Sequence, residues 1–192
     1  MRIVPVIAIA VVAATQLAAT PSQARDTISA EAADRVTIED LIAKYAFARD
    51  TTNADIYARI FAPDASFSVM GRHMGNGGRD QIVAGMRAQA KQFNPDAKPG
   101  QVNYGVMRHV ITNINIDVHG DTASADYYVL TLANDPEAKA PALVSVGRNH
   151  DTFVRTHGQW LIESSDLEYD WGNDHMAQLL HIGPRSAPPP KN

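Results

Sequence analysis

A histidine inside a mostly apolar stretch is the first candidate for chemistry in this sequence. Segment 107–118, MRHVITNINIDV, alternates in a way that predicts a β-strand. Period two places on one face Met107, His109, Ile111 and Asn113, and on the other Val110, Thr112, Ile114 and Ile116. An imidazole with a pKa of about 6.5 suits general-base catalysis at neutral pH. His109 is therefore either a general base in an apolar pocket or a core histidine hydrogen-bonded to a neighbour.

Polar side chains on the following strands are expected to join it. Tyr127 and Thr131 share one face of the next predicted strand, and Asn149 and Asp151 share one face of the strand after that. A bulge at Gly147 would exchange the faces of this last strand. Asp151 is also a second candidate acid or base. The candidate substrate-binding residues are Phe67, Asn113, Tyr127, Thr131, Asn149 and Asp151.

The elements that position these residues follow from hydrophobic periodicity. Helices are expected at 36–49 (with an earlier start near Ser29 also open), at 54–61 after the N-cap residue Asn53, and at 78–90. Strands are expected at about 65–70, 104–118, 122–133, 142–156 and 159–169, with a Gly-rich turn around Arg72. Three helices followed by a mainly antiparallel sheet predict an α+β fold, in which a strongly curved sheet closed by helices forms a cone around a pocket.

The two ends of the sequence are expected to lie outside this domain. Residues 1–24 combine a short basic start, an apolar run and a small-x-small site ending at Ala24, which is typical of a cleavable signal peptide. We expect a domain over 25–172 in a periplasmic or secreted protein, with no stable membrane anchor after cleavage. The alternative is an uncleaved anchor. Residues 173–192 are expected to form a partly disordered tail.

Composition excludes several classes of function. The sequence contains no cysteine, so thiolate nucleophiles, thiolate metal sites and disulfides are excluded. The remaining histidines have no ligand spacing, so we expect no metal site. No phosphate-binding loop or Gly-x-Ser-x-Gly motif occurs. A net charge of -4 without a basic run argues against nucleic acid as a partner.

The order and spacing of several short motifs resemble the SnoaL-like branch of the NTF2-like superfamily. These motifs are Tyr45 and Asp50 at the end of the first helix, FAPDA at 61–65, Arg108-His109 opening the long strand, and GxxHDxFVR at 147–155 before GQW at 158–160. The resemblance covers roughly residues 33–170. Within this branch the chain is most similar to scytalone dehydratase, bile-acid 7α-dehydratase and hexachlorocyclohexane dehydrochlorinase.

The resemblance implies a cofactor-independent site. The catalytic histidine of these enzymes falls at His109, the supporting aspartate at Asp50, and the tyrosine of the bile-acid enzyme at Tyr45. The sequence departs from the pattern near Thr131 or Ala133, where the dehydratases carry a second acid or histidine, and near Val69, where scytalone dehydratase carries a tyrosine. These departures leave the substrate open.

The chemistry of these three residues fits proton abstraction. A carboxylate on one imidazole nitrogen sets the tautomer and stabilises the imidazolium, so Asp50 would support His109 as a base. Tyr45 would stabilise enolate charge or protonate a leaving hydroxyl. The structural alternatives are that Asp50 only caps a helix and that Tyr45 only packs on the sheet.

Three functions are compatible with this interpretation. The first is a dehydratase-type lyase acting on a hydrophobic cyclic or aromatic molecule, such as a hydroxysteroid or an aryl alcohol. The second is a steroid-isomerase-like proton transfer, and the third is a non-catalytic binding or structural module. By resemblance, a homo-oligomer, either a trimer or a dimer, is expected.

Overall fold

The computed structural model describes residues 21–75, 77–93, 107–135 and 140–172. The elements follow the order α1 (Pro21–Thr51), α2 (Ala54–Ile60), β1 (Phe61–Val69), β2 (Arg72–Gly75), α3 (Arg79–Phe93), β3 (Met107–His119), β4 (Thr122–Asp135), β5 (Ala140–Thr156) and β6 (Gln159–Gly172). The three predicted helices and the predicted strands are therefore present. The prediction of a turn around Arg72 is wrong, because this segment forms the short strand β2 against β1.

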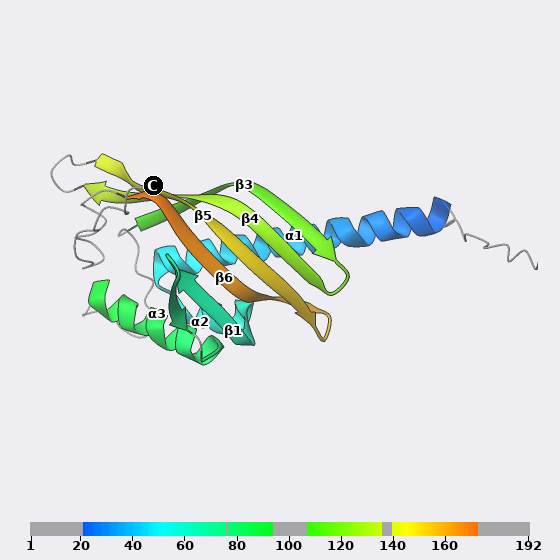
Figure 1. The fold of residues 1–192 in the computed structure, drawn as a ribbon, viewed down its shortest axis with the longest axis horizontal. Coiled ribbons are helices and arrows are strands. Elements are labelled where there is room, and N and C mark those ends of the chain that lie inside the picture. The colour runs from blue at the N-terminus through cyan, green and yellow to red at the C-terminus, as the bar shows by residue number, and fades with distance from the viewer. Residues whose placement is uncertain (1–20, 76, 94–106, 136–139, 173–192) are drawn as a thin grey trace, which may run out of the picture.

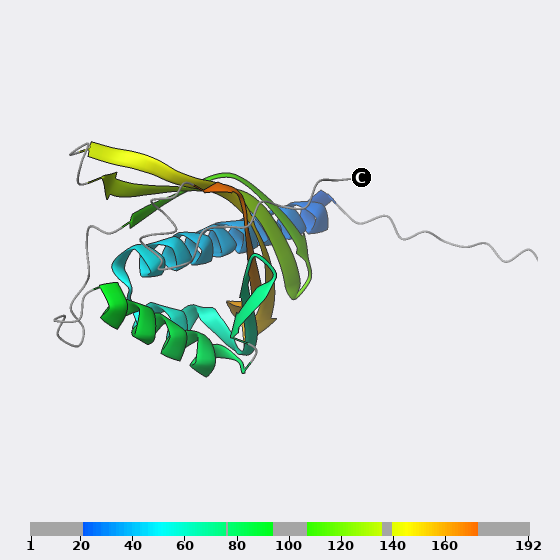
Figure 2. The same cartoon turned by 60° about the vertical axis from the view of Figure 1, so that its left-hand side comes forward.

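The strands form one open, curved sheet with the order β2-β1-β6-β5-β4-β3. All neighbours are antiparallel except β1 and β6, which are parallel. Figures 1 and 2 show the sheet bending over α1, with α2 and α3 beyond it. The result is a cone whose interior is bounded by α1 on one side and by the concave face of β3 to β6 on the other.

The C-terminal half of α1 packs against the sheet through one apolar stripe. Its buried residues are Ile38, Leu41, Ile42, Tyr45, Ala46 and Ala48, which recur at three- and four-residue spacing. Tyr45 stacks on Tyr57 of α2, with ring centroids 5.8 Å apart, and meets the ring of Phe61 edge-on at 6.2 Å. This aromatic cluster therefore ties α1, α2 and β1 into one core.

A tight corner ends α1 and starts α2. Thr52 has a φ of +51°, and Asn53 donates its backbone N–H to the Ala48 carbonyl at 2.9 Å, while the Thr52 N–H reaches the Arg49 carbonyl at 3.3 Å. This is the Schellman arrangement, with threonine where glycine is commonest. The Asn53 side chain then accepts the Asp55 N–H, which confirms its predicted role as N-cap of α2. The corner places the last turn of α1 beside β3.

The predicted face assignment of β3 is wrong after Thr112. The register with β4 shifts between Thr112 and Asn115, and Asn113 adopts a φ of +56° at this bulge. Because a bulge inserts an extra residue, Ile116 returns to the core face and is buried, whereas Asn113 is exposed. Asn113 therefore does not share the face of His109.

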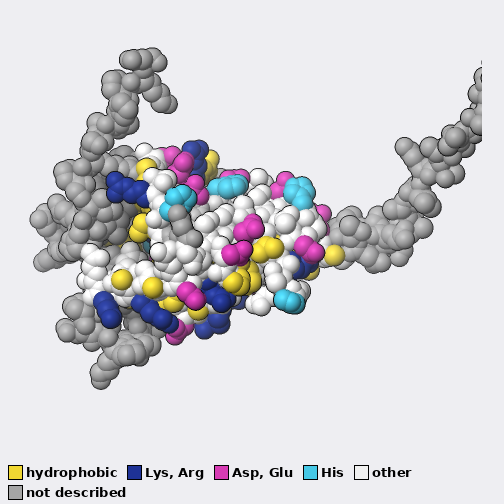
Figure 3. Space-filling model, turned by 60° about the horizontal axis from the view of Figure 1, so that its bottom comes forward, with side chains coloured by type: hydrophobic (Ala, Val, Ile, Leu, Met, Phe, Trp, Pro, Cys, Tyr) yellow, Lys and Arg dark blue, Asp and Glu magenta, His cyan; other side chains and the backbone are white. Residues whose placement is uncertain are grey.

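Two predictions fall largely outside the described residues. The proposed signal peptide covers 1–24, of which only 21–24 are described, as the start of α1, and the proposed tail 173–192 is not described. In the described part of the chain, no helix is long and apolar enough to span a membrane. On the face shown in Figure 3, acidic, basic and histidine side chains are interspersed with apolar ones.

A close approach of two strands at Gly147 generates the first prediction. A Cβ atom added to Gly147 would lie 2.3 Å from the Glu168 carbonyl oxygen on β6. We expect Gly147→Ala to lower the free energy of unfolding by about 1–3 kcal/mol, because the strand backbones must separate. Gly85 of α3 is the matched control, since its added Cβ meets nothing closer than 4.0 Å.

Gly85→Ala should raise the free energy of unfolding by about 0.5–1 kcal/mol through helix propensity. Urea denaturation of both variants measures the two changes. Equal stability of Gly147→Ala and the wild type would contradict the close approach.

Candidate active site

A histidine and an aspartate from distant parts of the chain meet inside the cone. His109 opens β3, and Asp50 lies in the last turn of α1. Asp50 Oδ1 is 2.6 Å from His109 Nδ1 and also accepts the backbone N–H of His109 at 2.9 Å. Only 3% of the His109 side chain and 12% of the Asp50 side chain are exposed. The structure therefore brings together the two residues that the sequence nominated.

The hydrogen bond to Asp50 assigns the tautomer of the imidazole. A carboxylate only accepts hydrogen bonds, so Nδ1 carries the proton and Nε2 carries the free lone pair in the neutral ring. His109 Nε2 is buried without a hydrogen-bond partner. An unpaired acceptor of this kind is the arrangement that a general base requires.

His109 lines a small pocket between α1 and the sheet. The lining residues are Tyr45, Ala46, Arg49, His109, Ile111, Val129, Asn149 and Leu167. The pocket encloses about 10 Å³, close to the minimum that one water molecule needs. A cyclic substrate would therefore enter only if part of this wall moved.

Burial and charge keep the His109 ring neutral. The pKa of His109 is lowered from 6.5, first by burial and then by the positive charge of Arg49, while the hydrogen bond and charge of Asp50 act in the opposite direction. A lowered pKa leaves the ring unprotonated at pH 7. The base is therefore ready to accept a proton without first losing one.

Arg49 is the site residue that the sequence analysis missed. Its Nη1 donates to the Tyr45 hydroxyl at 3.1 Å, and its guanidinium carbon lies 5.8 Å from the centroid of the Tyr45 ring. Burial raises the pKa of Tyr45, and the charge of Arg49 opposes that rise, so Tyr45 keeps its proton at pH 7 and can donate it. The available signal was the four-residue spacing of Tyr45 and Arg49, which puts both on one helix face.

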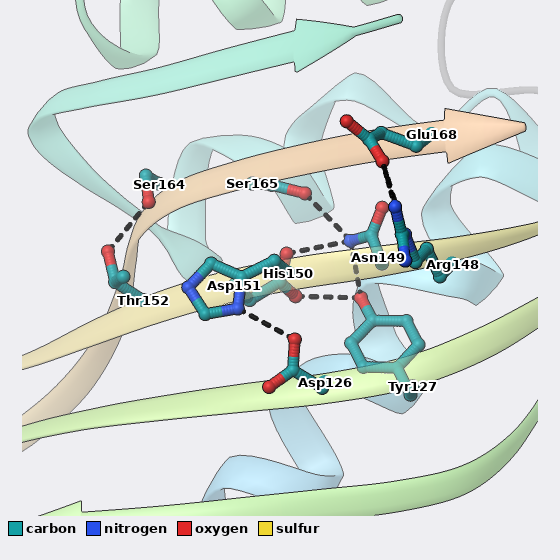
Figure 4. A network of polar contacts seen from close by, with 10 residues as sticks. All are labelled: Asp126, Tyr127, Arg148, Asn149, His150, Asp151, Thr152, Ser164, Ser165 and Glu168. Atoms are coloured by element: carbon teal, nitrogen blue, oxygen red, sulfur yellow. Dashed lines mark hydrogen bonds and ion pairs between the residues drawn. The ribbon is translucent and has the colours of Figure 1, made fainter. Parts of the chain in front are cut away.

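A second polar network joins buried side chains of β4, β5 and β6 (Figure 4). The Tyr127 hydroxyl donates to Asp151 Oδ2 at 2.7 Å. Asn149 Nδ2 lies 2.7 Å from Asp151 Oδ1, 2.8 Å from the Tyr127 hydroxyl and 3.0 Å from Ser165 Oγ. Burial raises the pKa of Asp151 to about 6, against the opposing hydrogen bonds from Tyr127 and Ser165. Asp151 therefore titrates in a range that is useful to an acid or base.

The other predicted substrate contacts take different places. Asn149 lines the pocket, whereas Asp151 and Tyr127 lie buried outside its lining. Thr131 pairs with His109 across β3 and β4 and is buried, and Phe67 packs edge-on against Tyr45 at 6.4 Å. Neither lines the pocket, and Asn113 is exposed at the bulge. The predicted faces of β4 and β5 are nevertheless confirmed, since Arg148 and His150 point outward and Asn149 and Asp151 inward.

Within the described residues, no group of three or more potential metal ligands comes together. His150 pairs instead with Asp126 on the outer face of the sheet, with His150 Nδ1 2.8 Å from Asp126 Oδ1. This histidine-aspartate pair has the same composition as the inner pair but lies exposed on the surface. It therefore provides a matched control for the inner one.

Comparison with known proteins agrees with this architecture. Residues 30–166 match the model of the SnoaL-like domain. The chain is 30% identical over 136 residues to an uncharacterized protein of Mycobacterium tuberculosis, covering 69% of this chain and 83% of that protein. An uncharacterized protein of Mycobacterium bovis matches with the same identity and coverage.

Solved structures share the fold at lower identity. An NTF2-like protein with a cystatin-like fold from Novosphingobium aromaticivorans superposes with a TM-score of 0.64 at 21% identity, covering 84% of this chain and 97% of that one. A provisionally assigned scytalone dehydratase from the same organism gives a TM-score of 0.59 at 20% identity, covering 77% and 91%. The resemblance to the SnoaL-like branch and the predicted fold class are both confirmed.

The pKa of His109 provides the second prediction. We expect its titration midpoint to lie below 6.5, and the Asp50→Asn substitution to lower it further, because the charge that favours the imidazolium is lost. NMR observation of the ring nitrogens against pH measures both midpoints. The His150→Ala variant simplifies the spectrum without touching the site. A midpoint that stays the same or rises in Asp50→Asn would contradict the pairing.

The pKa of Asp151 provides the third prediction. The folded value of about 6 exceeds the ordinary 3.8, so the protonated carboxyl stabilises the fold at low pH, and this contribution is lost as the pH rises through about 6. Asp151→Asn removes the ionisation. Its stability relative to the wild type should improve by about 2 kcal/mol between pH 4.5 and pH 7.5, as measured by urea denaturation. A difference that does not change with pH would show that Asp151 titrates normally.

Proposed function

The chain belongs to the SnoaL-like domain family, which includes dehydratases and isomerases, and from this premise we propose that it is a cofactor-independent enzyme in which His109 removes a proton from carbon. The observation that carries the proposal is the buried, unpartnered Nε2 of His109 beside the pocket, with Nδ1 held by Asp50. We propose dehydration as the reaction class. The relative described as a scytalone dehydratase supports this choice.

In the proposed reaction, His109 removes a proton and Tyr45 stabilises the charge that forms. Nε2 of His109 takes a proton from the carbon next to a carbonyl group, and the electron pair of the broken C–H bond moves to the carbonyl oxygen as an enolate. The Tyr45 hydroxyl donates a hydrogen bond to that oxygen. Collapse of the enolate forms the carbon–carbon double bond and expels a β-hydroxyl group, which leaves as water with the proton from the imidazolium.

The lining of the pocket supports a hydrophobic cyclic or aromatic substrate. Ala46, Ile111, Val129 and Leu167 supply apolar wall, and Asn149 supplies a polar group next to it. A substrate without a leaving group would instead be isomerised by the same base, so a steroid-isomerase-like reaction is the close variant.

The small enclosed volume favours one further candidate. A pocket of about 10 Å³ also fits a non-catalytic module whose interior is filled by its own side chains. The buried pair argues for the enzyme. An imidazole acceptor left unpaired in the core lowers the stability of the fold, so its presence is better explained by a catalytic role than by a structural one.

We also propose an exported homo-oligomer, either a trimer or a dimer. Export rests on the signal-like residues 1–24. Oligomerisation is supported by Val110, Tyr128 and Leu143 on the outer face of the sheet, which are 44%, 52% and 40% exposed.

Turnover assays supply the fourth prediction. Cyclic β-hydroxyketones are incubated with the protein, and loss of water is followed by mass spectrometry, with deuterium uptake from D₂O reporting proton removal. His109→Ala should lower the rate by about 10²- to 10⁴-fold, because the general base is lost. Asp50→Asn should also lower it.

The outer pair supplies the control. His150→Ala and Asp126→Asn disrupt a histidine-aspartate pair of the same kind on the surface and should leave the rate unchanged. If wild type and His109→Ala exchange deuterium equally, the proposed base is wrong. If the wild type binds such ketones without exchange or water loss, the binding module takes its place.

A further inference from the structure

Arg49 puts a positive charge into the pocket wall. It projects from the last turn of α1, between the corner that ends the helix and the aromatic cluster, and it lines the pocket together with Tyr45 and His109. Its hydrogen bond to the Tyr45 hydroxyl and its position near the Tyr45 ring orient the guanidinium. The group is therefore held in place and does not hang free in solvent.

This charge has no carboxylate partner among the described residues. The salt bridges of the described chain involve Arg79, Arg87, Arg148 and Arg155, but not Arg49. Asp50, the next residue, directs Oδ1 to His109 instead. Of the five N–H donors of the guanidinium, one is used by the Tyr45 hydroxyl in this part of the structure.

A guanidinium in a largely apolar wall is costly unless an anion compensates it. The neighbouring Tyr45 hydroxyl keeps its proton, accepts from Arg49 and also bonds to Ser165, so it can donate to the same anion by turning away from Ser165. Two donors from α1 thus line the same pocket as His109 of β3, whose Nε2 is unpartnered. The arrangement suits a molecule with an anionic oxygen on one side and an acidic C–H on the other.

We propose that Arg49 is a specificity-determining residue that selects ligands carrying an anionic oxygen, either a carboxylate or a phenolate, in this pocket. This inference deepens the proposed function and rests on it in one respect, because such ligands are substrates only if the protein is the proposed enzyme. The anionic oxygen lies against Arg49 and Tyr45, and the carbon skeleton lies against the apolar wall. Neutral analogues of the same shape bind less tightly.

Binding of small aromatic probes tests this fifth prediction. Benzoate and benzamide have nearly the same shape and differ in charge, and titration calorimetry measures the affinity of the full chain for each. We expect benzoate to bind about 10- to 100-fold more tightly than benzamide. In a second arm, 4-nitrophenol should show its phenolate absorption at a lower pH when bound, which separates phenolate from carboxylate recognition.

Substitutions then assign the effect to Arg49. Arg49→Gln should abolish the preference for benzoate, whereas Arg49→Lys should keep part of it, because lysine retains the charge but not the planar fork. Arg148→Gln is the matched control, since Arg148 is 63% exposed and pairs with Glu168 on the outer face. It should bind benzoate like the wild type.

A coupled readout distinguishes anion binding from a structural role. Bound benzoate compensates the charge of Arg49, so it should raise the pKa of His109 in the wild type and not in Arg49→Gln. The inference is overturned if benzoate and benzamide bind the wild type equally and nitrophenol ionises as in water, or if Arg49→Gln keeps the preference.

The two proposals fail separately. His109→Ala should lose proton removal yet still prefer benzoate, because Arg49 and Tyr45 remain. Selective benzoate binding without any deuterium exchange in the wild type would remove the enzyme and leave the anion site. Deuterium exchange on neutral ketones without a preference for benzoate would remove the anion site and leave the enzyme.

Discussion

A single carboxylate oxygen joins the two halves of this molecule at the site. Asp50 Oδ1 accepts both the backbone N–H and the Nδ1–H of His109, so the end of α1 and the start of β3 are held together at one point. Separating them would leave a largely buried carboxylate without its donors, which is costly. The orientation of the imidazole, the free lone pair on Nε2 and the closure of the pocket all depend on this contact.

The electrostatics of the pocket follow from what surrounds that contact. Burial lowers the pKa of His109 and raises those of Tyr45 and Asp151, so all three side chains are pushed toward their neutral forms. Arg49 retains its charge and adds to the lowering at His109. A pocket lined by a neutral base, a cation and a protonated tyrosine favours negative charge developing on a bound molecule.

Much of the fold was predictable because it depends on local periodicity. The apolar stripe of α1, the N-cap at Asn53 and the inward alternation of Asn149 and Asp151 are each written in a few neighbouring residues. The bulge at Asn113 was not, because asparagine tolerates a positive φ in many contexts and the register shift depends on how β3 meets β4. Segment 72–75 became a strand for the same reason, since pairing with β1 decided it.

The candidate site divides in the same way. Residue types, their spacing and a family resemblance were enough to nominate His109, Asp50 and Tyr45, because the order and spacing of motifs are visible in the sequence itself. Only the tertiary structure decided that Asp50 contacts the backbone N–H and Nδ1 of His109, that Arg49 lines the pocket and that Thr131 and Phe67 do not. Those facts depend on distances between segments that are far apart in the chain, such as His109 and Asp50, which are separated by 59 residues. Packing and strand register set such distances, and the local sequence does not.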